Sequence, residues 1–124
     1  MAGTVTVAEQ GQLAGITRIA YTWTSSAGGA ADGATTGLYS GELVRAVQAP
    51  DAAGTQPTDL YDVTVVDDDG VDVLFALGAN VSNAAPSQKH GVKDGLGAVA
   101  GSTLTLHVTN AGNAKGGKTI LYLR

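Results

Sequence analysis

The residues best suited to chemistry in this sequence are the aspartates of residues 67–72, which read DDDGVD. Four carboxylates so close together could hold Ca²⁺, a hard cation that takes several oxygen ligands. The spacing, however, lacks the alternate ligands and the distant bidentate glutamate of an EF-hand loop. Asp and Gly are also the residues that a hairpin turn prefers without any metal. We therefore expect a solvated turn and no metal site, with Asp67, Asp68 and Asp69 kept as candidates for contact with a partner.

Catalysis would need a nucleophile next to a base, and the two histidines do not supply that pattern. His107 alternates with threonines in residues 103–109, which predicts a surface position, and His90 follows Lys89 in a long connection. The chain has no G-x-S-x-G nucleophile elbow. Its glycine-rich runs, AGGAADG and NAGNAKGGK, match neither a Walker loop nor a dinucleotide fingerprint. The sequence thus predicts a protein that is not an enzyme and uses no cofactor.

The acidic turn joins two stretches that alternate like β-strands, residues 61–66 and 71–77. A three-residue loop would gather the bulky side chains of both stretches on one face, with Gly70 in the left-handed position that such a loop needs. The cross-strand pairs would then be Val65 with Val73, Val63 with Phe75, and Tyr61 with Leu77. We therefore expect a central hairpin in which Phe75 is buried.

Further strands are expected on both sides of this hairpin. They are residues 4–7, 16–24, 38–48, 103–109 and 119–123. Residues 38–48 alternate weakly, with Leu43, Arg45 and Val47 on one face, and a short helix is an alternative there. In residues 16–24, Tyr21 and Trp23 share a face with Ile19. These two aromatic side chains are expected in the core, and the alternative is a platform on which a sugar would stack.

Seven or eight short strands joined by irregular connections predict an all-β protein, a single antiparallel β-sandwich with a jelly roll among its arrangements. We expect residues 15–124 to form the sandwich and residues 1–14 to be an N-terminal arm or an edge strand. Residues 78–101 lack clear periodicity, and a connection of that length is usually functional or ordered by a partner.

Charge is unevenly distributed along a chain whose net charge is −4. Residues 46–72 hold seven acids and no Lys or Arg, whereas residues 73–124 hold five Lys or Arg and one acid. Such asymmetry suits attachment to a partner or to copies of the same chain, and two merely solvated ends are the alternative. The acidic total argues against a nucleic-acid binder. No apolar run approaches the roughly 20 residues of a membrane helix, no secretory signal is visible, and the absence of cysteine excludes disulfides.

Five segments carry a likeness to a known class of proteins. They are GITRIAYTWTS (15–25), GTQPTDLYDVTVVDDDGVDVL (54–74), LGANVSN (77–83), DGLGAVAGSTLTLHVTNAG (94–112) and GGKTILYL (116–123). Together they resemble small virion structural proteins of tailed bacteriophages, of the capsid decoration or cement type. The resemblance implies a small β-rich protein, present in many copies on the capsid surface of the virion after assembly in the host cytoplasm. It also implies binding to the major capsid protein and no catalysis.

These observations together predict a non-enzymatic capsid decoration protein that binds the major capsid protein lattice and stabilises the head. The alternative is a carbohydrate-binding or host-adhesion module in a head fibre or tail component. Expected partners are the major capsid protein and copies of the chain itself, as a dimer or trimer, without nucleic acid or membrane. Candidate interface residues are Lys89, His90 and Lys93 in the long connection, with Asp67, Asp68 and Asp69. The lysines would be steered towards acids of a neighbour, including the acidic turn of another copy.

Overall fold

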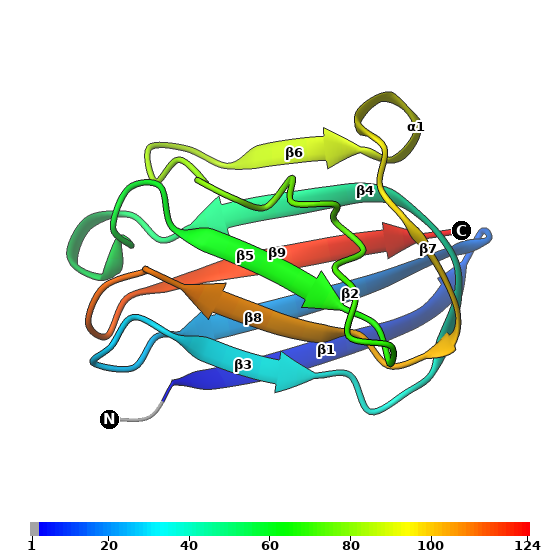
Figure 1. Ribbon diagram of the computed structural model, residues 1–124, viewed down its shortest axis with the longest axis horizontal. Coiled ribbons are helices and arrows are strands. Elements are labelled where there is room, and N and C mark those ends of the chain that lie inside the picture. Colours follow the sequence, from blue (N-terminus) through cyan, green and yellow to red (C-terminus); the bar gives the residue numbers. More distant parts are fainter. Residues whose placement is uncertain (1–2) are drawn as a thin grey trace.

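The computed structural model describes residues 3–124 and consists of two antiparallel β-sheets packed face to face (Figure 1). The larger sheet contains β1 (Thr4–Leu13), β2 (Ile16–Thr24), β4 (Tyr39–Pro50), β6 (Ser87–His90), β7 (Ala98–Ser102) and β9 (Gly116–Leu123). The smaller sheet contains β3 (Ala31–Ala34), β5 (Asp62–Val66) and β8 (Thr105–Thr109). Two short helical turns, η1 (Ala53–Thr55) and α1 (Gly91–Asp94), lie in the connections. The predicted all-β antiparallel sandwich is confirmed.

The strand order is β1-β2-β9-β4-β6 in the larger sheet, where β7 also pairs with β4, and β3-β8-β5 in the smaller sheet. This six-and-three division is unlike the eight-stranded, double-sheet jelly roll that the sequence left open. Because the smaller sheet has only three strands, irregular chain after β5 must cover part of β4 and β6 in its place. Within residues 3–124, no helix has the length and apolar character needed to span a membrane.

The core lies between the two sheets and follows the predicted alternation in most strands. Ile19, Tyr21 and Trp23 of β2 are all buried, as are Leu106 and Val108 of β8. In β5 the inward residues Val63 and Val65 are buried as well. A strand in which every second residue is apolar can bury only one face, so the local sequence pattern was enough to predict which of these side chains are buried.

The sequence left an arm or an edge strand open for residues 1–14. Residues 4–13 form β1 at the edge of the larger sheet, and residues 1 and 2 lie outside the described residues. Val5 packs across the sandwich onto β3, where a Cβ added to Gly33 would lie 2.5 Å from the Cβ of Val5. Glycine at position 33 therefore lets the two sheets approach each other at this edge.

The prediction of the central hairpin is correct only for the residues next to the turn. Val66 pairs with Asp72, and the Val73 amide donates to the Val65 carbonyl at 2.8 Å, which is the predicted register. Beyond Val73 the chain leaves the strand path, and residues 73–79 form a series of turns. The predicted burial of Phe75 is wrong, because its side chain is 60% exposed.

The partner expected for Tyr61 is also wrong, since Tyr61 pairs with Val81 instead of Leu77. The cause is the side chain of Asp72. Its carboxylate accepts hydrogen bonds from the amides of Leu74 (3.0 Å) and Ala76 (2.9 Å), which turns the backbone away from β5.

The long connection of residues 78–101 contains more regular structure than its sequence indicates. Its β6 pairs with residues 45–48 of β4, and its β7 pairs with the beginning of β4. All four residues of β6, with the sequence SQKH, are exposed. A strand without an apolar face gives no period-two signal, which explains why the sequence did not reveal it.

A bulge in β4 changes which of its side chains face the core. The pairing with β9 shifts register between Leu43 and Arg45, so that the alternation predicted from Leu43 onward is broken. After the bulge, Ala46 and Gln48 are buried, whereas Arg45 is exposed. The bulge therefore places a polar side chain, Gln48, on the inner face of the sheet.

Candidate functional site

The predicted cationic residues lie on β6 and α1, along one margin of the larger sheet. The backbone amide of His90 donates to Asp94 Oδ2 at 2.6 Å, and His90 Nδ1 accepts from the Lys93 amide at 3.4 Å. Gly95 then ends the helix in the left-handed conformation, with φ of 82°. His90 thus caps a single helical turn and orients the segment that carries Lys93.

Lys89 and Lys93 are exposed, and neither forms an ion pair within residues 3–124. The ion pair found in this part of the chain joins His107 to Asp32, at 2.5 Å, across β8 and β3 on the outer face of the smaller sheet. The surface position expected for His107 is consistent with this contact. Both lysines are therefore free to meet a carboxylate from another molecule.

The acidic turn uses two of its three candidate carboxylates to organise its own backbone. Asp67 Oδ1 accepts from the amides of Asp69 (2.9 Å) and Val71 (3.1 Å). Asp68 Oδ1 accepts from the Thr103 hydroxyl at 2.5 Å, which ties the turn to the chain before β8. The carboxylate of Asp69 is exposed and makes no hydrogen bond within residues 3–124.

The structure does not bring the acidic turn and the cationic residues together within one chain. No ion pair joins the acidic turn to Lys89 or Lys93 within residues 3–124, and in Figure 1 β7 runs from α1 towards the turn that follows β5. Within the described residues, no group of three or more His, Asp or Glu side chains could hold a metal ion. The turn is held by backbone hydrogen bonds and by the Asp67 carboxylate, with Gly70 at φ of 77°.

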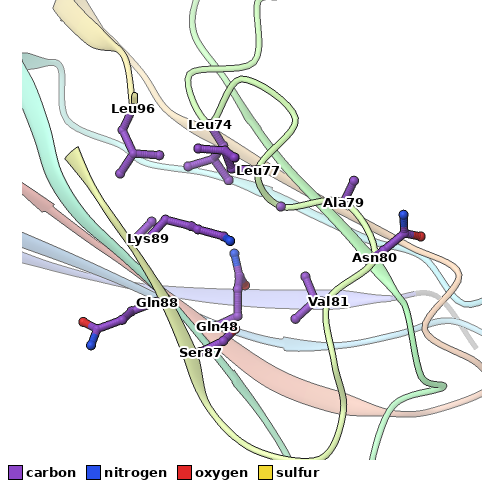
Figure 2. Close-up of a pocket in the computed structure, with 12 residues that line it drawn as sticks. Gln48, Leu74, Leu77, Ala79, Asn80, Val81, Ser87, Gln88, Lys89 and Leu96 are labelled. Carbon is purple, nitrogen blue, oxygen red and sulfur yellow. The ribbon is translucent and has the colours of Figure 1, made fainter. Parts of the chain in front are cut away.

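A pocket opens where β4 and β6 meet the irregular residues 74–81, and its cavity volume is about 110 Å³ (Figure 2). Its apolar walls come from Leu74, Leu77, Val81 and Leu96. Its polar lining includes Lys89 of β6 and Gln48 of β4. Sequence reasoning named Lys89 but missed Gln48, because a glutamine between apolar residues gives no sign of facing inward until the bulge is known.

Tyr21 and Trp23 belong to the core, as expected, and the sugar-stacking alternative for this pair is wrong. Their side chains are 0% and 1% exposed. The Tyr21 hydroxyl donates to the Leu104 carbonyl at 2.7 Å, and burial raises the pKa of this phenol. Trp23 packs against Tyr61 with ring centroids 5.5 Å apart. A buried ring cannot stack on an external ligand.

Glu9 is a second residue that sequence reasoning missed. Its carboxylate accepts hydrogen bonds from Tyr39 OH (2.6 Å), the Gly37 amide (2.9 Å), and the amide (3.0 Å) and hydroxyl (2.8 Å) of Thr36. The Tyr39 hydroxyl and these amides hold the pKa of Glu9 at about 2, against an ordinary 4.5, although partial burial opposes the shift. Glu9 therefore fastens β1 to the segment that leads into β4.

Comparison with known proteins found no match to this chain among protein-family models, curated proteins or solved structures.

Proposed function

We propose that this protein is a non-enzymatic structural protein of a bacteriophage virion, most simply a capsid decoration protein that binds the major capsid protein and stabilises the head. The proposal rests on the resemblance of the sequence segments to phage virion proteins and on one surface of the structure. That surface, called here the β6–α1 surface, consists of Lys89, Lys93, Val92 and Phe75.

The β6–α1 surface combines cations with exposed apolar side chains. Val92 is 84% exposed and Phe75 is 60% exposed. Phe75 lies against the segment between α1 and β7, because a Cβ added to Gly97 would lie 3.3 Å from its ring. Lys89 and Lys93 have no acidic partner within residues 3–124. Apolar anchors beside unpaired charges are what a protein–protein interface requires.

The backbone at Phe75 also favours a role in binding. Phe75 has φ of 49° and Ala76 has φ of 64°, in a region that bulky residues avoid. The Asp72 carboxylate holds this conformation by accepting the Ala76 amide. A strained backbone that holds a phenylalanine side chain in solvent does not stabilise the fold. We therefore propose that Phe75 is held in this position to contact a partner.

The expected partner surface is acidic and is either the capsid lattice or a second copy of the chain. Asp69 supplies such an acid on another copy, because its carboxylate is exposed and has no hydrogen bond within residues 3–124. The β1 segment, by contrast, is an integral strand of the larger sheet, so the proposal does not rely on residues 4–13. A ligand that binds only the assembled lattice stabilises it by mass action.

The test is retention on capsids assembled from the coat protein of the virus that encodes this chain. The variant Lys89→Glu/Lys93→Glu should be lost from capsids at a lower salt concentration than the wild type, since reversed charges would repel an acidic partner. Phe75→Ala should also reduce retention, because it removes an apolar anchor.

Lys118→Glu is the matched control, since Lys118 is an exposed lysine of β9, away from the β6–α1 surface. It should be retained like the wild type. Equal retention of the wild type, the double variant and Phe75→Ala across the salt series would mean that attachment uses another surface. Imaging then separates decoration from the adhesion alternative: decoration predicts many copies over the capsid, and adhesion predicts few copies at vertices or the tail.

A further inference from the structure

The pocket shown in Figure 2 combines an amide hydrogen-bond donor without a protein partner in residues 3–124, a lysine and apolar walls. We infer that it is a binding site for a carboxylate carried on a short aliphatic chain. The inference concerns the pocket between β4, β6 and residues 74–81, and it holds whether or not the protein binds a capsid.

Gln48 supplies the amide donor. Its side chain is only 6% exposed, and its Oε1 accepts a hydrogen bond from the Thr119 hydroxyl at 2.7 Å. This contact fixes the amide, so that Nε2 points into the pocket, as Figure 2 shows. Nε2 makes no hydrogen bond within residues 3–124. The amide nitrogen is not among the fully buried unpaired atoms of these residues, so it faces the open side of the pocket, where a ligand oxygen could replace water as its acceptor.

Lys89 supplies the charge. It pairs with Ala46 on the neighbouring strand, and Gln48 lies two residues along β4, so both side chains are on the same face of the sheet. Figure 2 shows the Lys89 ammonium and the Gln48 amide nitrogen both directed into the pocket. Two donors directed at one point suit a ligand with acceptor oxygens.

The rest of the lining decides what kind of acceptor fits. It contains no Asp or Glu, so Lys89 is its one charged residue and the pocket favours an anion. A single cation and a single amide suit the two oxygens of a carboxylate, whereas a phosphate usually takes more cations or a helix N-terminus. Leu74, Leu77 and Leu96 would contact the apolar part of the ligand.

The size of the pocket limits the ligand to a few carbon atoms. Its volume of about 110 Å³ is smaller than the roughly 150 Å³ of an apolar cavity that accommodates benzene. Two sources offer a carboxylate on so short a chain. One is a free short-chain fatty acid, and the other is a glutamate side chain presented by a docked protein.

The experiment is a titration of the ¹⁵N-labelled protein, followed through the side-chain amide resonances of Gln48. The probes are sodium butyrate for the free acid and N-acetyl-glutamic acid α-amide for the protein side chain, with butyramide as the uncharged control. The Gln48 resonances should move to saturation with at least one carboxylate and remain in place with butyramide. Tighter binding of one probe identifies its source as the natural one.

Two variants test the role of the charge. Lys89→Met keeps the length of the side chain and should weaken carboxylate binding roughly tenfold or more, as expected for the loss of a charge-assisted hydrogen bond. Lys118→Met, the matched control on β9, should bind like the wild type, because Lys118 is exposed and does not line the pocket. The inference is overturned if neither carboxylate gives a saturable shift at Gln48, or if Lys89→Met binds as tightly as the wild type. Capsid retention is a separate measurement and does not affect either outcome.

Discussion

Glu9 joins the edge strand β1 to the segment before β4, and replacing it with glutamine removes one charge at nearly constant size. The carboxylate accepts four hydrogen bonds, from Tyr39, from Gly37 and twice from Thr36. A glutamine side chain has one acceptor oxygen and one amide group that can only donate. Glu9→Gln therefore leaves some of these donors facing another donor.

The expected loss is worked from these contacts. Hydrogen bonds to charged groups contribute about 1.5–3 kcal/mol each, and solvent screening lowers that value at a partly exposed site. The remaining glutamine oxygen would keep part of the network. We expect Glu9→Gln to lower the free energy of unfolding by about 2 kcal/mol near pH 7, which corresponds to a melting temperature lower by roughly 5–8 °C.

The pH dependence provides the sharper test. Because the folded-state pKa of Glu9 is lowered to about 2 from 4.5, its stabilisation is complete above pH 4.5 and is lost as the pH falls towards 2. The wild type and Glu9→Gln should therefore converge in stability as the solution is acidified, since glutamine does not titrate.

The assay is urea unfolding followed by circular dichroism, at a series of pH values from 7 down to the lowest at which unfolding stays cooperative. Glu42→Gln is the matched control, because the Glu42 side chain is exposed and makes no hydrogen bond within residues 3–124. It should match the wild type near pH 7. A difference between wild type and Glu9→Gln that stays constant across the pH range would refute the reasoning, since it would show that the carboxylate charge is not what these donors stabilise.

Four further predictions concern stability. Phe75→Ala should change the free energy of unfolding by less than about 1 kcal/mol because the ring is 60% exposed. Leu106→Ala should cost about 2–5 kcal/mol because its side chain is fully buried. Equal losses of stability in thermal unfolding would contradict this prediction. Asp72→Ala should cost about 2 kcal/mol, since its carboxylate accepts three backbone amides, and amide exchange in residues 73–79 should accelerate. Gly91→Ala should disturb the contact of α1 with β4, because a Cβ there would lie 2.2 Å from a backbone oxygen of β4; an unchanged melting temperature and an unchanged NMR spectrum around α1 would oppose this. Adding Ca²⁺ or a chelator should leave the melting temperature unchanged, and a rise of several degrees with Ca²⁺ would make the acidic turn a metal site.

The candidate site shows where sequence reasoning stops. Lys89 and Lys93 stood out as cations in a long connection, and both are exposed without an acidic partner within residues 3–124. Neither the short strand that carries Lys89 nor the pocket beside it was visible in the sequence. A pocket made from β4, β6 and residues 74–81 depends on which distant segments pack together, and no local pattern encodes that.

By itself, the sequence determined the sandwich core. In residues 19–23 and 103–109, every second residue is a large apolar or aromatic one, and the geometry of an extended chain leaves such a strand only one way to face the interior. The same local geometry identified the turn at Gly70. These features are properties of a few consecutive residues, so they survive any arrangement of the remaining chain.

Only the tertiary structure decided what happens where a side chain competes with the strand pattern. Residues 71–77 alternate as a strand would, yet Asp72 captures the amides of Leu74 and Ala76 and diverts the chain. One bulge after Leu43 turns Gln48 inward, where it meets the pocket. In both places the alternation of the sequence predicts which side chains face the core, and the structure differs. At Asp72 the cause is a set of side-chain hydrogen bonds, and after Leu43 it is a shift in strand register. These contacts have a cost or benefit of a few kcal/mol that depends on neighbours far away in the sequence, so they are settled only when the sheets come together.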